Sequence, residues 1–333
     1  ERSAVAVHPS GEAAIEIDGL RKSYPRFHPS GRRKLRPSDD DVTWAVRGIS
    51  LHVRRGEIFA FLGPNGAGKT TTVEIMEGFR RRDGGDVRVL GVDPEHGTRD
   101  WRARIGIVLQ EGKAQPNLTV RETLELWAAY YPRPKPVAET IALVGLTEKV
   151  DERVARLSGG QRRRLDVGLA LAGDPDLIFL DEPTTGFDPV ARRAAWSVIA
   201  GLRELGKTVF LTTHYLDEAQ ELADRVAIIK AGVIVAEGPP EALGAGSAVT
   251  QITFVPPAGL DLAELPAGPA LELVDGVAVL RTELPTRVLA ELCGWAAGRG
   301  IELERLEVTR PTLEDVYLDL VESAEAAEPA GAA

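Results

Sequence analysis

The sequence predicts a layered α/β domain followed by a smaller α/β domain. Between about residues 57 and 238, short apolar runs typical of buried strands alternate with helical segments, which is the pattern of helices packed on a parallel sheet. A composition rich in proline, glycine and alanine follows over residues 239–270, and strand and helix patterns continue after it. The chain of 333 residues is long enough for about two domains, in agreement with this division.

The first part of the chain is expected to be rich in β-structure. Over residues 14–62, apolar side chains such as Ile15 and Ile17 alternate with polar ones, as in a strand with one buried face. Residues 25–43 interrupt this pattern with three prolines, a basic run and an acidic run, and we expect a mobile loop insertion there. Five apolar runs are expected to form buried strands of the layered domain: 58–62, 105–109, 177–180, 209–211 and 226–229.

Helix predominates between the second and third of these strands. Residues 116–172 have helical patterns interrupted by prolines, so we expect a helical subdomain over about 111–172. A linker is expected near 239–248. The elements expected after it are strands around 249–255, 271–274, 277–281 and 301–308 and a helix near 285–298.

The second domain, expected over residues 249–320, has enough apolar residues for a sheet covered by a helix. The residues expected to share one sheet face are Ile252, Phe254, Leu271, Leu273, Val277, Val279, Ile301 and Leu303. The residues expected to cover it from the helix are Val288, Leu289 and Leu292. A terminal amphipathic helix is predicted from apolar residues at i, i+3, i+4 and i+7: Leu313, Val316, Tyr317 and Leu320. Residues 322–333 are expected to be a disordered tail.

The charge and cysteine content exclude several classes of protein. With 50 acidic and 40 basic residues the formal charge is −10, which argues against nucleic acid as the main partner. The single cysteine, Cys293, rules out an intrachain disulfide framework and fits a reducing, cytoplasmic setting, where it would be a small core residue. No run of 18 apolar residues is present, so no membrane-spanning helix is expected, and no targeting segment is visible.

The segment after the first buried strand matches the phosphate-binding loop (P-loop) pattern. Its residues are Gly63, Pro64, Asn65, Gly66, Ala67, Gly68, Lys69 and Thr70. The glycines let backbone N–H groups wrap a phosphate, and the helix after the loop directs its positive end at the same anion. Lys69 would contact the β- and γ-phosphates, Thr70 would bind Mg²⁺, and Thr71 would add a hydrogen bond to phosphate.

Two carboxylates end the apolar run at 177–180. Buried carboxylates at the end of a strand are costly unless they serve a cation or a reaction. We expect Asp181 to hold the Mg²⁺ shell through water, and Glu182 to act as the general base that polarises the attacking water.

A second anion site is predicted at residues 157–161, which read Leu-Ser-Gly-Gly-Gln and precede a helical run. Its residues are Ser158, Gly159, Gly160 and Gln161. A serine and two glycines at a helix start form a phosphate cradle, although a serine cap of an ordinary helix is the alternative. A chain with one P-loop and a second cradle suggests a composite site, in which one molecule contributes the P-loop and another the cradle.

Together, the three motifs resemble those of the ATP-binding cassette (ABC) ATPases, whose signature is the Leu-Ser-Gly-Gly-Gln run between the P-loop and the Asp-Glu strand. The resemblance covers about residues 14–240. It implies a nucleotide-binding domain of the P-loop NTPase, RecA-like kind, with an antiparallel β subdomain and a helical subdomain. It also implies ATP and Mg²⁺ as cofactors.

By the order of its motifs, the family resemblance implies roles for four further residues. These are Gln110 as the Q-loop residue that contacts Mg²⁺ and senses the membrane partner, Asp188 in the D-loop at 186–188, His214 as the switch histidine at the γ-phosphate, and Tyr24 as the aromatic stacked on adenine. Phe27 and Trp44 are alternatives to Tyr24. The D-loop has Phe187 where leucine is more usual, and we expect this to change packing and not activity.

The same resemblance implies transport. Chromosome-maintenance members carry long coiled coils and translation-acting members usually carry two cassettes, and neither is present in this sequence. Residues 311–317, Pro-Thr-Leu-Glu-Asp-Val-Tyr, resemble the end of the antibiotic-resistance export ATPases of the daunorubicin-resistance type, which pair with separately encoded ABC-2-type permeases.

The expected protein is therefore the ATPase subunit of an exporter of drug, antibiotic or lipid-like compounds. It would form a head-to-tail homodimer at the cytoplasmic face of the membrane and bind an ABC-2-type permease on a separate chain. The alternatives are an ABC importer ATPase and a non-transport ABC ATPase that acts on translation. The sequence does not identify the cargo.

Overall fold

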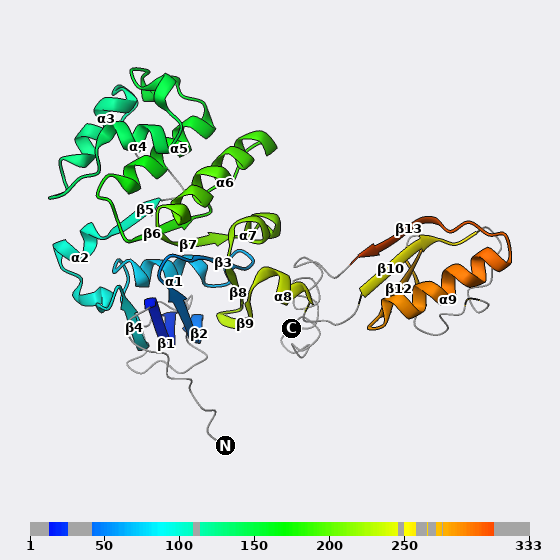
Figure 1. Cartoon of the computed structure of the whole chain (residues 1–333). Helices are drawn as coiled ribbons and strands as arrows, with labels where there is room; N and C mark the ends of the chain where they lie inside the picture. The colour runs from blue at the N-terminus through cyan, green and yellow to red at the C-terminus, as the bar shows by residue number, and fades with distance from the viewer. Residues whose placement is uncertain are drawn as a thin grey trace, which may run out of the picture. The chain divides into compact units, whose positions relative to one another are not determined.

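The structure is a computed structural model that describes residues 13–25, 42–108, 114–245, 250–257, 265, 271–274 and 276–309. The chain divides into two compact units, of which the first ends at Gly238 and the second begins at Pro239 (Figure 1).

A six-stranded sheet forms the centre of the first unit. Its strands in spatial order are β5 (Ile105–Val108), β6 (Leu177–Asp181), β7 (Thr208–Thr213), β3 (Ile58–Leu62), β8 (Arg225–Lys230) and β9 (Val233–Gly238). The first five are parallel and β9 is antiparallel. The five apolar runs expected to be strands all lie in this sheet, apart from position 109, which is outside the described residues. Their near-continuous burial follows from helices that cover the sheet.

The first unit also contains a three-stranded antiparallel sheet, which packs against the large sheet through α1. Its order is β2 (Val42–Arg54), β1 (Ala13–Pro25) and β4 (Gly84–Val89). The helix α1 (Lys69–Met76) lies between the two sheets, and buried side chains of both sheets and of α1 form one core cluster (Figure 1). The expected loop insertion lies outside the described residues over 26–41, and its two ends belong to β1 and β2.

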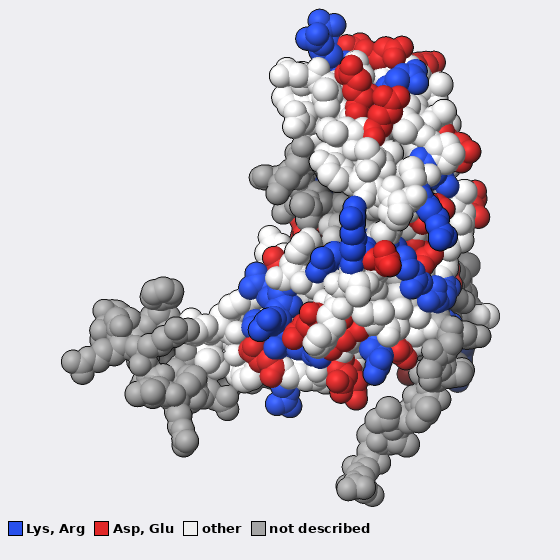
Figure 2. All heavy atoms as spheres, turned by 90° about the vertical axis from the view of Figure 1, so that its left-hand side faces the viewer, with Lys and Arg blue, Asp and Glu red and all other residues white. Residues whose placement is uncertain are grey.

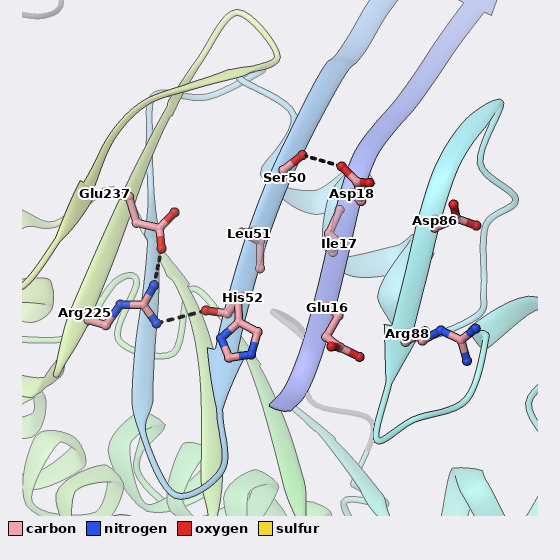
Figure 3. Close-up of a pocket in the computed structure, with 10 residues that line it drawn as sticks. All are labelled: Glu16, Ile17, Asp18, Ser50, Leu51, His52, Asp86, Arg88, Arg225 and Glu237. Atoms are coloured by element: carbon pink, nitrogen blue, oxygen red, sulfur yellow. Dashed lines mark hydrogen bonds and ion pairs between the residues drawn. The ribbon is translucent and has the colours of Figure 1, made fainter. Parts of the chain in front are cut away.

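Hydrogen bonds and ion pairs of charged side chains connect the two sheets at their edges. Arg225 of β8 donates to the backbone carbonyl of His52 in β2 and pairs with Glu237 of β9 (Figure 3). On the outer face of the antiparallel sheet, the Ser50 hydroxyl donates to Asp18 at 3.2 Å. A pocket opens between these groups, but none of the predicted site residues lines it.

The helices of the first unit fall into two groups: some cover the large sheet, and others form a separate helical layer. Those of the helical layer are α3 (Val120–Ala128), α4 (Val137–Leu143) and α5 (Gly159–Leu171), with short 3₁₀ turns at Thr147–Lys149 and Val154–Arg156. Those nearer the sheet are α2 (Arg99–Ala103), α6 (Pro189–Glu204) and α7 (Leu216–Leu222), and a 3₁₀ turn spans Pro94–His96. The helix α3 begins at Val120, directly after a capping box formed by Thr119 and Glu122.

The second unit is a four-stranded antiparallel sheet with one long helix. Its elements are α8 (Pro240–Ala245), β10 (Thr250–Val255), β11 (Leu271–Val274), β12 (Val277–Thr282), α9 (Pro285–Gly298) and β13 (Glu304–Thr309). The spatial order is β11-β12-β10-β13, so β12 and β13 run parallel to each other on either side of β10, with α9 as their connection. This is a βαβ unit split by a third strand.

Several expectations for the second unit are wrong in detail. Val277 and Val279 do not share a face with Ile252, because Ile252 pairs with Leu280 and therefore Leu280 lies on its face. A shift of one residue exchanges the two faces of a strand, and an apolar run such as 277–280 does not reveal which parity is buried.

Other corrections concern the ends of elements. Residues 240–245 form a helix within the expected linker, and β13 starts at Glu304, after Ile301. Cys293 is exposed and not part of the core. The helix expected at 313–320 and the tail at 322–333 lie outside the described residues. Within the described residues, no helix is long and apolar enough to cross a membrane.

We predict that replacing Phe210 with alanine lowers the free energy of unfolding of the first unit by about 3–5 kcal/mol. Phe210 is fully buried in β7, and its ring lies 5.6 Å from that of Phe59 and 5.8 Å from that of Phe179, on the two neighbouring strands. Urea denaturation followed by circular dichroism measures the change. The control Phe79→Ala removes a ring that is 71% exposed, and should change the free energy by less than about 0.5 kcal/mol. Equal effects of the two substitutions would contradict this account of the core.

Candidate active site

Three neighbouring strands end at one edge of the large sheet and carry the predicted motifs. The strands β6, β7 and β3 are adjacent and parallel, so their carboxyl ends lie side by side. The P-loop follows β3, Asp181 ends β6, and His214 follows β7. Ligands of open parallel sheets bind at this edge, and the topology therefore brings together motifs that are far apart in the sequence.

Close backbone approach requires glycine at two positions of the P-loop. A Cβ on Gly63 would lie 2.3 Å from the carbonyl oxygen of Ile229 in β8, and a Cβ on Gly68 would lie 2.3 Å from that of Ala45 in β2. Gly68 also has a φ of 110°, which L side chains rarely adopt. The backbone of the loop is thus packed closely against β8 and β2. The start of α1, with its free N–H groups, lies at the edge of the sheet where β3 ends.

Lys69 is the first residue of α1, and its ammonium group is enclosed by the loop. Its Nζ donates to the carbonyl oxygens of Gly63 at 2.6 Å and Pro64 at 3.2 Å, and lies 3.8 Å from Glu182 Oε1. Burial lowers the pKa of Lys69, while the carboxylates of Glu182 and Asp181 oppose this shift. An anion with several oxygens can replace these neutral carbonyls as a stronger, charge-assisted partner of Lys69.

Glu182 stands between Lys69 and the imidazole of His214. The distance from His214 Nδ1 to Glu182 Oε1 is 3.3 Å. The hydroxyl of Thr185 donates to Glu182 Oε2 at 3.2 Å, and the Glu182 N–H donates to the carbonyl oxygen of Thr212 at 3.1 Å. The backbone of Glu182 has a φ of 45°, in the left-handed region that favours glycine. A half-buried carboxylate held in this way can accept a proton from a water molecule beside it.

Asp181 has a different environment from its neighbour. The Thr212 hydroxyl donates to Asp181 Oδ1 at 2.5 Å, and this leaves Asp181 Oδ2 as an oxygen acceptor at the strand end. Thr70 is an exposed residue in the first turn of α1. Oxygen donors of this kind suit Mg²⁺, which usually takes one or two protein ligands and completes its shell with phosphate and water.

Tyr24 lies at the end of β1, beside the start of α1. Its hydroxyl is 3.4 Å from Thr71 Oγ1. Lys22 Nζ and Arg80 Cζ lie 5.7 Å and 5.3 Å from the centre of the Tyr24 ring. The structure therefore brings Tyr24 next to the P-loop helix, with two cations close to its ring.

The remaining predicted residues of this part of the site lie as follows. Asn65 and Gly66 are exposed at the tip of the loop, and Ala67 is buried and donates its N–H to the Pro64 carbonyl at 3.2 Å. Trp44, the alternative to Tyr24, is in β2 opposite Ser23. Phe27 and Gln110 lie outside the described residues.

The signature residues begin a helix of the helical layer. Ser158 caps α5: its hydroxyl accepts from the Gln161 N–H at 3.3 Å, and the Gln161 side chain accepts from the Ser158 N–H at 2.9 Å. Ser158 and Gly159 are exposed, and Gly160 is half-buried. Asp188 similarly caps α6 and accepts from the N–H groups of Val190 and Ala191. Both helix starts therefore face solvent with their caps made within the chain.

No sequence motif marks three groups near the site, namely Glu77, Arg163 and Arg192. Glu77 ends α1 and is buried, and its only sequence signal is an acidic residue directly after an apolar helical run. Arg192 stacks over the ring of Tyr215 at 4.4 Å, and that ring lies 4.1 Å from the ring of His214. The arginines are part of charged runs that read as solvated helix faces, so only the fold reveals their positions.

Known proteins resemble both units. Residues 46–185 match the family described as ABC transporter, and residues 250–312 match the one described as ABC transporter domain-containing protein-like, C-terminal domain. The linearmycin resistance ATP-binding protein LnrL of Bacillus subtilis (strain 168) is 36% identical to this chain, over 83% of this chain and 93% of its own length. The chain belongs to the ABC transporter family.

Further relatives agree with this membership. The Nod factor export ATP-binding protein I of Paraburkholderia xenovorans (strain LB400) is 41% identical over 70% of this chain and 73% of its own length. Among solved structures, CbiO1 of Clostridium perfringens, part of the ABC transporter complex cbiONQ, has 26% identity and a TM-score of 0.59, and covers 70% of this chain and 91% of its own. A dimeric ATP-binding cassette in a post-hydrolysis state, bound to ADP and Pi, shares the fold with 24% identity and a TM-score of 0.56, over 68% of this chain and 98% of its own.

The family prediction and the fold prediction are therefore confirmed. This ABC ATPase binds ATP and hydrolyses it for transport, as a subunit of the exporter group to which the Nod factor export protein belongs.

We predict that Glu77 makes the nucleotide-free protein less stable as the pH rises. Burial, with smaller effects of Asp181 and Glu74, raises the pKa of Glu77 from an ordinary 4.5 to about 8. The folded state therefore holds a proton that the unfolded state loses above about pH 4.5, and this stabilisation is lost as the pH rises through about 8.

The variant Glu77→Gln should flatten the pH dependence and should be more stable than the parent at pH 8.5, by on the order of a few kcal/mol. Urea unfolding at pH 5.5, 7 and 8.5 without nucleotide or Mg²⁺ measures this. The matched variant Glu125→Gln replaces an exposed carboxyl and should leave the profile of the parent unchanged. If the free energy of unfolding of Glu77→Gln and of the parent changed with pH in the same way, Glu77 would not be protonated in the folded state at neutral pH.

Proposed function

We propose that this chain powers export through a separate ABC-2-type membrane permease, by hydrolysing Mg²⁺-bound ATP at the edge formed by β3, β6 and β7. The observation that carries the proposal is the position of Glu182 Oε1, 3.8 Å from the P-loop lysine and 3.3 Å from His214 Nδ1. A candidate base, a phosphate-binding cation and an imidazole thereby converge on one point.

In the proposed binding step, the P-loop holds the phosphates of ATP. Backbone N–H groups at the start of α1 point to the β-phosphate, and Lys69 exchanges the carbonyls of Gly63 and Pro64 for phosphate oxygens. Thr71 adds a hydrogen bond to phosphate, and Tyr24 stacks on the adenine. Each of these residues acts on the nucleotide before any bond breaks.

The oxygen donors Thr70 and Asp181 fit Mg²⁺, and Gln110 would be a third ligand from the segment after β5. When bound, Mg²⁺ supplies charge neutralisation at the phosphates. Mg²⁺ usually keeps several waters and binds one or two protein ligands together with substrate phosphates, so these few oxygen donors are enough for it.

In the hydrolysis step, the Glu182 carboxylate accepts a proton from the attacking water. Thr185 and Thr212 hydrogen-bond to Glu182, and His214, 3.3 Å from the same carboxylate, would orient the water or contact the γ-phosphate. Because a general base must lie within hydrogen-bond reach of the water, small shifts of Glu182 should cost activity directly.

A head-to-tail homodimer would complete each site. The exposed start of α5 offers Ser158 and Gly159 to an anion on another molecule, because the Ser158 hydroxyl acts as acceptor in its cap and can still donate its own hydrogen. The D-loop aspartate, Asp188, would lie beside the same interface. Two copies would thus enclose two nucleotides, each held between one P-loop and one signature turn.

Apolar side chains support a protein partner for the cassette at the cytoplasmic face of the membrane. Phe79 is 71% exposed, Leu126 on α3 is 39% exposed, and Tyr130, just after α3, is 65% exposed. Aromatic residues are enriched at protein–protein interfaces, so these side chains are candidates for the contact with the permease. On the face in Figure 2, Lys and Arg are interspersed with Asp and Glu and with uncharged surface, and this favours a protein partner over nucleic acid.

The cargo that we propose is a drug-like or lipid-like compound, as the names of the linearmycin resistance and Nod factor export relatives suggest. We also propose that residues 14–240 carry the ATP chemistry alone, because every motif of the site ends by His214. The domain at 249–320 would then steady the dimer or the permease contact.

We predict that Glu182→Gln keeps nucleotide affinity within about threefold and lowers ATP turnover by about 10²–10⁴-fold. The substitution removes the base and leaves Lys69 and the P-loop intact. Phosphate release measures turnover, and a fluorescent ATP analogue measures affinity. The control Glu125→Gln on α3 should hydrolyse ATP like the parent. Turnover within a few-fold of the parent would remove Glu182 from the proposed mechanism.

We predict that Ser158→Arg and Lys69→Ala are each inactive and restore activity together. Their mixed dimer has one intact site, formed by the P-loop of one chain and the signature turn of the other. A 1:1 mixture should reach roughly a quarter of parental ATPase activity, since half of the dimers are mixed and each has one working site of two. A mixture no more active than its separate components, although both variants enter dimers on a sizing column, would speak against a shared site.

A further inference from the structure

Arg163 reaches from the signature helix to the loop that carries Glu182. It lies in the second turn of α5 and is only 8% exposed. Its Nε donates to the carbonyl oxygen of Pro183 at 3.0 Å, and its Nη2 donates to that of Asp181 at 2.9 Å. These carbonyls belong to the residues immediately before and after Glu182. One guanidinium group thus bonds the carbonyls of both residues that flank the candidate base, Asp181 before it and Pro183 after it.

The backbone of Glu182 needs such support. Its φ of 45° lies in the left-handed region, where a residue with a Cβ is disfavoured by about 1–2 kcal/mol. A conformation of this kind persists only when its surroundings fix it. Thr212 holds the Glu182 N–H from the β7 side, at 3.1 Å, and Arg163 holds the flanking carbonyls from the α5 side. Without Arg163, the Glu182 N–H keeps its bond to Thr212, but the carbonyls of Asp181 and Pro183 lose their partner on the α5 side.

The chemistry of the contact requires arginine. A guanidinium presents several donors in a rigid plane, so it can bond two carbonyls at once, whereas the point charge of lysine has no such fork. Burial lowers the pKa of Arg163, and the neighbouring Asp166 is the strongest opposing influence. Asp166 is itself buried beside it, and Arg163 and Asp166 both line a pocket with Gly159 and Glu182. The signature turn and the candidate base therefore line the same pocket.

We propose that Arg163 is a positioning residue for ATP hydrolysis: through the carbonyls of Asp181 and Pro183 it holds Glu182 in its working position and fastens that position to the signature helix α5. The proposal rests on the role of Glu182 given above. Since Ser158 caps the start of α5, a movement of the signature turn on nucleotide contact would be carried along this helix to the Glu182 loop of the same chain.

The test is a double-mutant cycle of Arg163→Gln and Glu182→Gln in the full chain. If Arg163 acts through Glu182, Arg163→Gln lowers kcat by about 10- to 100-fold in the parent, with the affinity for a fluorescent ATP analogue within about threefold, and by less than about threefold in the Glu182→Gln background. An equal loss in both backgrounds, or an unchanged kcat in the parent, would overturn the proposal. Loss of nucleotide affinity in step with kcat would also overturn it, because it would indicate general damage.

The matched control is Arg164→Gln. Arg164 is the next residue of α5 and also donates to a backbone carbonyl, that of Gly145 at 2.8 Å, but in the helical layer. It should retain the parental kcat. The variant Arg163→Lys keeps the charge with a single flexible ammonium, and its kcat should lie between those of the parent and Arg163→Gln. If Arg163→Gln does not fold, Arg163→Lys carries the test, and a parental kcat for it would overturn the proposal.

Failure of this inference is distinct from failure of the proposed function. An active Glu182→Gln variant would contradict the proposed function, whatever Arg163 does. An inactive Glu182→Gln with a fully active Arg163→Gln would leave the proposed function standing and would contradict only the positioning role.

Discussion

The site of this protein depends on the packing of three parallel strands, β6, β7 and β3. The central strand β7 is buried along its whole length, and Phe210 at its middle contacts aromatic rings on both neighbouring strands. Because the register of the strands is fixed by this packing, Leu62 stands opposite Thr213, and Asp181 stands opposite Thr212. The hydrophobic core thus sets where the polar groups after each strand begin.

Buried charge is the second constraint on the fold. Lys69 and Glu182 lie largely out of water near the strand ends, and such groups are costly unless they are paired or hydrogen-bonded. The protein meets this cost with backbone carbonyls around Lys69 and with hydroxyl and N–H donors around Glu182. These neutral partners keep the site folded without fully satisfying its charges. A triphosphate with its cation offers stronger partners to the same groups, which gives nucleotide binding a direct physical reason.

The second unit follows a different logic from the first. Its sheet buries one face under α9 through Ile252, Phe254, Ala278 and Leu280, while the residues of β13 are exposed throughout. None of the phosphate-binding motifs lies in it. Residues 250–312 match a family of C-terminal domains of ABC proteins, and this unit has a core of its own.

The sequence by itself determined the class of the protein, and it predicts which residues make up the site. The spacing of the P-loop, of the signature residues and of the Asp181-Glu182 pair identifies the chemistry, because phosphate binding and water activation need these residue types in local patterns that a linear chain displays. The strongly apolar strands were predictable for the same reason, because a strand buried on both faces consists of consecutive apolar residues.

Tertiary structure alone decided what depends on contacts between distant segments. The parity of residues 277–280, the burial of Glu77, the stack of Arg192 on Tyr215 and the two bonds of Arg163 carry no local signal. Three consecutive arginines, 162–164, cannot be told apart by residue type. In the structure Arg163 is buried against the Glu182 loop, whereas Arg162 is exposed and Arg164 is half-buried. The direction of each side chain from α5 depends on where the helix packs against the end of β6, and that packing is a property of the folded chain and not of any short segment.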